Sequence, residues 1–195
     1  MIKVLILDVK NGNLNSLFNI IKKKITKNVI VSGAKRDIEN ATHIIFPGVG
    51  AYGEVMRKLN KNICIKTLKK NILIKKKPFL GICVGMQVLF SESNEFGNSK
   101  GLNWIKGKIT NLKKPNIGWS KINILEENKI IKHDLSSKEF YFLHNFYIKK
   151  NKSSVAILNS NISAVINQDN IYGTQFHPEN SHEQGVELLK NFTNI

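Results

Sequence analysis

Two patterns of hydrophobic residues divide the chain into two parts. In the first part, continuous apolar runs alternate with stretches whose apolar residues recur every three or four positions. A continuous run is typical of a strand buried on both faces, whereas the second spacing is typical of a helix with one buried face. The pattern predicts strands at 2–9, 29–32, 43–46 and 79–82, and helices at 14–24, 51–76 with an interruption near 60–62, and 84–90.

In the second part, shorter apolar stretches are separated by tight turns. They predict strands at 105–112, 121–125, 140–148, 154–158, 163–167 and 171–175, then a helix at 184–192. We expect these strands to run antiparallel and to be appended to the first sheet or to extend it. Because we find no repeat or linker, we predict one domain over residues 1–195. The predicted fold is α/β: an open, mixed, mainly parallel sheet flanked by helices, with added antiparallel strands.

The composition is that of a soluble globular protein. The 195 residues suffice for one hydrophobic core, and 42% are hydrophobic and 23% charged. No apolar run reaches the roughly 20 residues that span a bilayer, so we expect no membrane partner. Two distant cysteines, Cys64 and Cys83, suggest no disulfide framework and favour a cytoplasmic location. Because no Cys-x-x-Cys pair or histidine cluster occurs, we expect no metal site and no cofactor.

The formal net charge of +16 raises the question of a nucleic-acid partner. The lysines, however, are spread along the chain, and aromatic residues make up only 8% of it. No stacking surface of aromatic residues alternates with the basic ones, as single-strand binders require. We therefore expect no nucleic-acid partner.

The segment Gly81-Ile82-Cys83-Val84-Gly85 follows the fourth predicted strand and has the clearest chemistry. Gly-x-Cys-x-Gly has the form of a nucleophile elbow, in which small neighbours permit a sharp strand-to-helix turn. The positive end of the next helix would stabilise a thiolate, and backbone N–H groups at the turn would hold an oxyanion. The alternative is that Cys83 is a small buried hydrophobic residue beside a packing glycine.

A nucleophilic cysteine needs a base, and the chain contains five histidines. His177 ends the last predicted strand, and the carboxylate of Glu179 would hold its tautomer and stabilise its imidazolium. The other histidines have simpler interpretations: His43 as a core residue, His133 and His182 as surface residues, and His144 as a structural residue among aromatic ones. The elbow and the His-Pro-Glu segment together favour nucleophilic catalysis over a structural role.

These motifs resemble those of a known family. GICVGMQ, followed far along the chain by QFHPE, is similar to the class I glutamine amidotransferases, and the resemblance covers nearly the whole chain. Within that family, PGVGAYG, GLNWIKGKI and FYFLHNFY resemble the glutaminase subunits of imidazole glycerol phosphate synthase. Such subunits supply ammonia to a (β/α)₈ cyclase subunit in histidine biosynthesis. The resemblance implies a flavodoxin-like core and a heterodimer with such a cyclase.

The resemblance also implies roles for single residues. Cys83 would attack the carboxamide of L-glutamine, His177 would act as base and then acid, and Glu179 would orient His177. Ammonia would leave, and water would then hydrolyse a glutamyl thioester. Four residues would contact the substrate: Gln87, Glu95, Gly48 and Gly50. The oxyanion would be held by the N–H of Val84 and a second donor from Val49 or Gly50. The family's Pro-Gly-Val-Gly segment is gated by the partner, which implies low activity for the isolated chain.

Several positions depart from the family's usual residues. Residues 8–13 replace a usual Asp-Tyr-Gly-x-Gly-Asn, and six more departures are Asn116, Ile117, Ser120, Asn145, Phe146 and Asn180. The usual Lys at the last position pairs with an Asp of the cyclase, so its loss removes a contact that registers the partner. A related subunit that supplies ammonia to a nucleotide-sugar amidase in surface-polysaccharide synthesis therefore stays open as an alternative.

Two other classes of function are less well supported by the residues. A cysteine hydrolase acting alone, such as a gamma-glutamyl peptidase, would need an ungated oxyanion site and a pocket larger than free glutamine requires. A non-enzymatic binding module would not need Cys83, His177 and Glu179 together.

Overall fold

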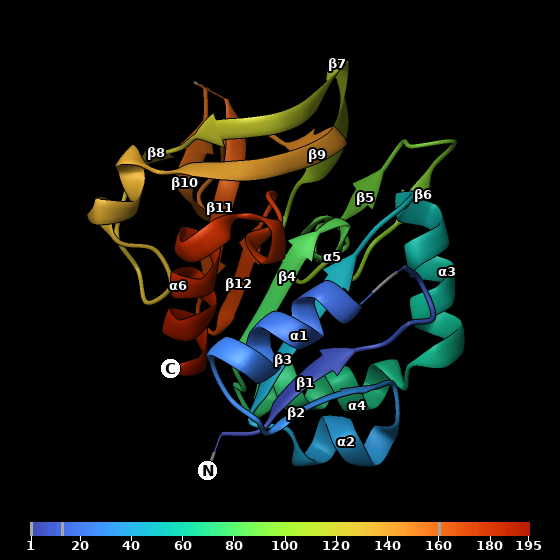
Figure 1. Cartoon of the computed structure of the whole chain (residues 1–195). Coiled ribbons are helices and arrows are strands. Elements are labelled where there is room, and N and C mark those ends of the chain that lie inside the picture. Colours follow the sequence, from blue (N-terminus) through green and yellow to red (C-terminus); the bar gives the residue numbers. More distant parts are fainter. Residues whose placement is uncertain (1, 13, 160) are drawn as a thin grey trace.

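The centre of the chain is an eight-stranded mixed sheet, seen in a computed structural model that describes residues 2–12, 14–159 and 161–195 (Figure 1). The strand order is β2 (Val29–Ser32), β1 (Val4–Leu7), β3 (His43–Gly48), β4 (Phe79–Cys83), β12 (Ile171–Thr174), β11 (Ile162–Gln168), β10 (Ser154–Leu158) and β8 (Asn123–Ile124). The first five strands are parallel, and the last three join antiparallel. The parallel part has the flavodoxin-like order, in which ligands bind at the carboxyl ends of the strands. The predicted fold class is confirmed.

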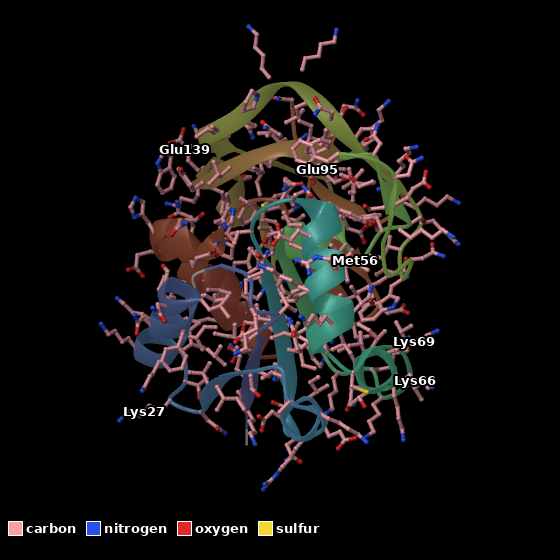
Figure 2. All side chains as sticks on the ribbon, turned by 90° about the vertical axis from the view of Figure 1, so that its right-hand side faces the viewer. Lys27, Met56, Lys66, Lys69, Glu95 and Glu139 are labelled. Atoms are coloured by element: carbon pink, nitrogen blue, oxygen red, sulfur yellow. The ribbon has the colours of Figure 1, made fainter. Side chains whose placement is uncertain are left out.

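Helices cover both faces of the parallel strands, which explains why β1, β3 and β4 are buried throughout. Helices α1 (Asn15–Lys24) and α6 (His182–Thr193) lie side by side on one face, and α3 (Tyr52–Asn62) and α4 (Ile65–Lys69) lie on the other, with α2 (Lys35–Asn40) beside α4 (Figures 1 and 2). The interruption expected near 60–62 falls slightly later, at 63–64 between α3 and α4. A π-helical turn, η1 (Lys70–Ile74), continues α4.

A second sheet lies over the carboxyl ends of the parallel strands (Figure 1). It has the order β6 (Ser99–Lys100), β5 (Glu92–Ser93), β7 (Lys108–Lys121) and β9 (Glu139–Ile148). Two hydrogen bonds join β9 to the segment after β12. The N–H of His177 donates to the Tyr141 carbonyl at 2.9 Å, and the N–H of Tyr141 donates to Ser181 Oγ at 3.0 Å. The site described below therefore lies between the two sheets.

Several predicted elements were wrong in detail. The strands expected at 105–112 and 121–125 correspond to one continuous strand, β7, and to the short β8. The Lys-Lys-Pro at 113–115 reads as a turn, yet pairing with β9 resumes at Asn116 after a register irregularity. Neither β7 nor β9 extends the main sheet. The short elements α2, β5, β6 and the 3₁₀ turns η2 (His133–Ser137) and η3 (Pro178–Asn180) had no periodic signal. The altered segment 8–13 ends at Asn13, which lies outside the described residues.

Candidate active site

The predicted elbow is a sharp turn at the end of β4. Cys83 has φ +53° and ψ −115°, a conformation that costs a non-glycine residue about 1–3 kcal/mol. The backbone around it is crowded. A Cβ on Gly85 would lie 1.9 Å from the Phe46 carbonyl oxygen, and one on Gly81 would lie 2.6 Å from that of Gly85. Glycine is therefore required on both sides of the strained cysteine.

The helix predicted at 84–90 ends early, because α5 spans only Val84–Gln87. The apolar side chains of Val88–Phe90 are fully buried, which produced the helical pattern. Their carbonyls, however, accept hydrogen bonds of 2.8–3.1 Å from the N–H groups of residues 102–105. The segment 88–90 therefore binds the loop at 102–105 and does not continue the helix. One helical turn remains after the nucleophile.

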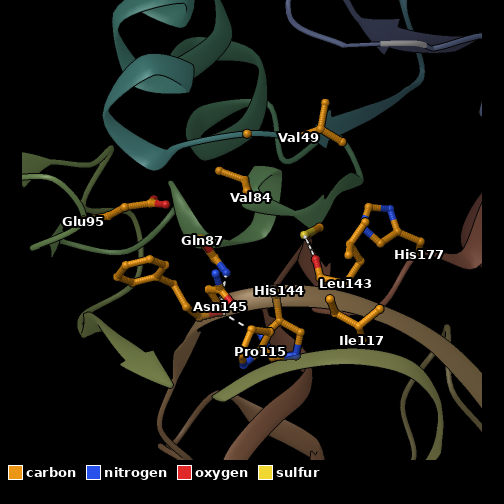
Figure 3. A pocket seen from close by; sticks show the side chains of 13 residues that line it. Val49, Val84, Gln87, Glu95, Pro115, Ile117, Leu143, His144, Asn145 and His177 are labelled. Carbon is orange, nitrogen blue, oxygen red and sulfur yellow. Dashed lines mark hydrogen bonds between the residues drawn. The ribbon is translucent and has the colours of Figure 1, made fainter. Parts of the chain in front are cut away.

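The sulfur of Cys83 lies between a hydrogen-bond acceptor and a donor. Cys83 Sγ is 3.8 Å from the Leu143 carbonyl oxygen, to which a thiol can donate. On another side, Gln175 Nε2 donates to Sγ at 3.7 Å. Cys83 is almost fully buried in the wall of a cavity of about 300 Å³, a volume typical of small-molecule sites (Figure 3).

His177 follows β12 and lines the same cavity as Cys83. Its Nδ1 lies 2.9 Å from Glu179 Oε1, and its carbonyl accepts a hydrogen bond from Ser181 Oγ at 2.6 Å. Burial by itself would lower the pKa of His177, but its interactions with Cys83 and Glu179 are stronger and raise that pKa to about 10. His177 is therefore an imidazolium near neutral pH, and Glu179 fixes its orientation.

His144 is a second buried histidine in the cavity wall, on β9. Its Nδ1 donates to the Phe146 carbonyl at 3.0 Å, and its Nε2 accepts from Asn116 Nδ2 at 3.0 Å. Burial and, to a smaller extent, the nearby His177 lower the pKa of His144, the bond to Phe146 raises it, and the net pKa is about 4. His144 is therefore neutral and serves as a hydrogen-bonding strut, in keeping with the structural role expected for it.

The other three histidines lie away from the cavity. His43 is buried on β3, with Nδ1 2.9 Å from Thr42 Oγ1. His133 is exposed in η2, and His182 is exposed and stacks on Trp119 at 4.6 Å between ring centroids.

Gln87 and Glu95 both line the cavity, as Figure 3 shows. Gln87 Nε2 donates to the Phe146 carbonyl at 2.8 Å and to Gln175 Oε1 at 3.1 Å. Both amide hydrogens of Gln87 are thus used, which leaves its Oε1 as an acceptor for a ligand N–H. Glu95 Oε2 accepts the N–H of Tyr52 at 2.7 Å, so its carboxylate is held at the cavity edge, where it can attract an ammonium group.

The end of the segment Pro47–Gly50 forms the part of the cavity wall opposite the second sheet. Val49 and Gly50 line the cavity, whereas Gly48 does not: it packs on the elbow, where a Cβ would lie 2.3 Å from the Gly85 nitrogen. The Val49 carbonyl accepts a hydrogen bond from Asn11 Nδ2 at 2.5 Å, and Lys58 Nζ holds Asn11 Oδ1 at 2.9 Å. The N–H groups of Val49 and Gly50 have no hydrogen-bond partner among the described residues, so they are free to bind an anion.

Sequence reasoning missed the hydrogen-bond partners that surround the catalytic candidates. Gln175 stood in the quoted QFHPE motif, and a polar residue in a buried strand was a signal that it has a partner. Asn116 was noted only as a departure from the family. The Phe146 carbonyl, which accepts hydrogen bonds from Gln87 and His144, is a backbone group that the identity of a side chain does not reveal. Within the described residues, no group of three His, Cys, Asp or Glu side chains is arranged to hold a metal ion. No helix in that part of the chain has the length and apolarity needed to cross a membrane.

Comparison with known proteins agrees with this geometry. Residues 5–195 match the family model for "Glutamine amidotransferase class-I". The chain is 38% identical over 203 residues to the imidazole glycerol phosphate synthase subunit HisH of Leptospira interrogans, covering 97% of this chain and 98% of that protein. It is 39% identical to the subunit HisH of Leptospira borgpetersenii, with the same coverage.

Solved structures show the same fold. The structure of PurLQS from Thermotoga maritima superposes with a TM-score of 0.75 at 14% identity, over 99% of this chain and 98% of the other. With a family model over nearly the whole sequence and relatives well above 30% identity, the chain belongs to the class I glutamine amidotransferases, and within them to the HisH-type subunits of imidazole glycerol phosphate synthase.

Proposed function

We propose that this chain hydrolyses L-glutamine to glutamate and ammonia, and that it passes the ammonia to a (β/α)₈ cyclase subunit in histidine biosynthesis. The observation that carries the chemistry is the strained elbow of Cys83 in one cavity with the His177–Glu179 pair. The pathway is supported by the identity to HisH subunits over nearly the full length of the chain.

The first half of the reaction forms a thioester. The Cys83 thiolate bonds to the carboxamide carbon of glutamine, and the carbonyl oxygen becomes an oxyanion. Backbone N–H groups of Val84 and of Val49 or Gly50 hold this oxyanion. His177, protonated because its pKa is about 10, gives its proton to the departing nitrogen. The C–N bond breaks, ammonia leaves, and a glutamyl thioester remains on Cys83.

The second half hydrolyses the thioester. His177, now neutral, takes a proton from water while the water oxygen bonds to the acyl carbon. The C–S bond breaks, glutamate leaves, and the thiolate–imidazolium pair is restored. In this scheme His177 acts as acid in the first half and as base in the second, and the base-then-acid order implied by the resemblance stays a prediction. Glu179 keeps the imidazole in the orientation that both steps use.

The cavity suits free glutamine better than a peptide. Its volume of about 300 Å³ lies at the lower limit of small-molecule sites. Gln87 Oε1 offers an acceptor and Glu95 a carboxylate to the amino end of the substrate. A gamma-glutamyl peptidase would need more room, so a stand-alone hydrolase is disfavoured.

Exposed apolar side chains at the cavity mouth supply a surface for the partner. Val49, Ile117 and Leu143 line the cavity and are 41–64% exposed, and Trp119 is exposed on β7 nearby. Such a patch on an otherwise charged surface is typical of a protein interface. Asn180 is exposed and lacks the charge that the family's lysine would bring, so we expect this partner contact to be weaker here.

The proposal is tested by glutamate release from the purified chain, alone and with the cyclase subunit of the same organism. We expect low activity alone and strong stimulation by the cyclase, because a gated oxyanion donor changes the rate by about 10²–10³. Replacing Cys83 with Ala should abolish the activity. Cys64→Ala is the matched control, since Cys64 is exposed and away from the cavity.

Retained glutaminase activity in Cys83→Ala would contradict the chemistry. Full activity of the isolated chain would contradict the gating. Stimulation by a partner from a polysaccharide cluster, with none by the cyclase, would contradict the histidine pathway and favour the nucleotide-sugar alternative.

A further inference from the structure

Gln175 is a fully buried residue directly after β12, and the reaction scheme above does not use it. Its side chain touches the reacting atom of the proposed site, because Nε2 lies 3.7 Å from Cys83 Sγ. Its other end, Oε1, accepts a hydrogen bond from Gln87 Nε2 at 3.1 Å. A buried primary amide of this kind needs partners at both ends, and here one of the partners is the nucleophile.

The direction of the Gln175 amide is fixed by a series of hydrogen bonds. If the amide were flipped, its oxygen would face the sulfur and would repel a thiolate. Gln87 prevents this because its Nε2 donates to Gln175 Oε1 and also to the Phe146 carbonyl at 2.8 Å. The same carbonyl accepts from His144 Nδ1 at 3.0 Å, and Asn116 holds the other nitrogen of that ring. The series therefore starts on β7 and ends at the sulfur with an N–H.

The two neighbours of Sγ favour opposite forms of the cysteine. The Leu143 carbonyl, 3.8 Å away, can only accept and so favours the thiol. The amide N–H of Gln175 can only donate and so favours the thiolate. We propose that Gln175 is a positioning residue for the nucleophile: its Nε2–H, aimed by Gln87, stabilises the thiolate of Cys83 in the direction of attack. This role rests on the proposed function, because that function requires the Cys83 thiolate as the nucleophile.

Other titratable groups near the sulfur must be considered in any test that varies pH. His177 faces the sulfur from the segment after β12, with Glu179 behind it, and His144 and Glu95 line the same cavity. His177 supplies the opposite charge, and His144 is neutral above about pH 4. Gln175 itself does not titrate, so replacing it changes the hydrogen bond to the sulfur without removing an ionisable group.

The test measures thiolate formation directly. In a Cys64→Ser background, Cys83 is the single thiol, and its ultraviolet thiolate absorbance and alkylation by iodoacetamide are followed against pH. Gln175→Met keeps the size but removes the donor. We expect it to raise the midpoint of the titration by about one pH unit and to slow alkylation about tenfold below that midpoint. Gln175→Glu should shift the midpoint further upward. Gln168→Met, at an exposed position of β11, is the matched control and should titrate as the parent does.

The proposal is overturned if a folded Gln175→Met or Gln175→Glu variant, judged by circular dichroism and its unfolding midpoint, titrates as the parent does. Because Gln175→Glu is isosteric, it decides the question if the Met variant does not fold. Neither readout depends on glutamine. A parent chain that lacks glutaminase activity but shows the shift would refute the proposed function alone, whereas an active chain without the shift would refute the role of Gln175 alone.

Discussion

The two walls of the cavity bury their histidines almost equally but give them different charges: His177 is protonated near neutral pH and His144 is neutral. His177, on the main-sheet side, is 4% exposed, and His144, on the second sheet, is 7% exposed. The pKa of His177 is raised to about 10, whereas that of His144 is lowered to about 4. Burial lowers the pKa of both rings, so the difference comes from their neighbours. Cys83 and Glu179 surround the first ring, and an amide and a carbonyl surround the second.

This contrast assigns different tasks to the two sheets. In the proposed mechanism, the carboxyl end of the main sheet provides the groups that break and form bonds. The second sheet provides neutral hydrogen bonds that orient Gln87 and, through it, Gln175. A charged group on the second sheet would disturb the ion pair opposite it, because electrostatic interactions are strong in a cavity with little water. Three changes to the cavity walls test this division of tasks.

The largest effect is expected from Glu179→Gln. This change removes the carboxylate that orients His177 and helps to raise its pKa. We expect the turnover number to fall about 10⁴-fold, as when the carboxylate of a Ser-His-Asp triad is replaced by an amide. The pKa of His177 should also fall, so the high-pH limb of the rate profile should move to lower pH.

Glu183→Gln is the matched control for this change. Glu183 is exposed on α6 and pairs only loosely with Lys24 at 3.6 Å, so the control should keep its rate. A loss of less than about tenfold in Glu179→Gln would show that the carboxylate is not part of the mechanism.

A smaller effect is expected on stability at acid pH. The pKa of His144 is about 4 in the folded chain and near 6.5 when unfolded, so the unfolded state binds more protons between these values. The stabilisation from neutral His144 is complete above pH 6.5 and is lost as pH falls towards 4. It amounts to about 3 kcal/mol of unfolding free energy. We expect His144→Gln to lose less stability between pH 7 and pH 4 than the parent, measured by urea unfolding.

His133→Gln is the control for this comparison, because His133 is exposed. His43, whose pKa is also lowered by burial, adds the same slope to every variant and cancels in the difference. Equal slopes for His144→Gln and the parent would mean that folding does not lower the pKa of His144, and the contrast between the walls would fail.

The smallest effect is expected from Asn11→Ala. Asn11 holds the Val49 carbonyl, and the C=O and N–H of a trans peptide point in opposite directions. The hydrogen bond therefore fixes the orientation of the Val49–Gly50 peptide, with the Gly50 N–H turned away from Asn11. Without it we expect the turnover number to fall about tenfold, less than the 10²–10³ for losing an oxyanion donor outright.

Asn28→Ala removes a similar amide-to-carbonyl bond, 2.7 Å long, to Ile2 and should leave the turnover number unchanged. A higher rate in Asn11→Ala would contradict this role of Asn11, because it would mean that Asn11 holds the Val49–Gly50 peptide in an unproductive orientation.

The main-sheet wall could be predicted from the sequence, and the second-sheet wall could not. Gly81, Gly85 and the strand before them encode the elbow locally, and Glu179 lies two residues from His177. The contacts of the second wall join residues far apart in the chain: Asn116 meets His144 across 28 positions, and Phe146 meets Gln87 across 59. The length of β7 was also hidden, because its exposed Lys-Lys-Pro segment carries a turn signal and no apolar alternation.

The central claim is that Cys83 forms a glutamyl thioester, and peptide mass spectrometry tests it most directly. The chain is mixed with glutamine and its cyclase partner, quenched in acid during turnover, and digested. The account predicts a mass increase of one glutamyl acyl group on the peptide that contains Cys83, absent from Cys83→Ala and removed by hydroxylamine. Turnover of glutamine with no adduct on Cys83, or with an adduct on another residue, would contradict the account.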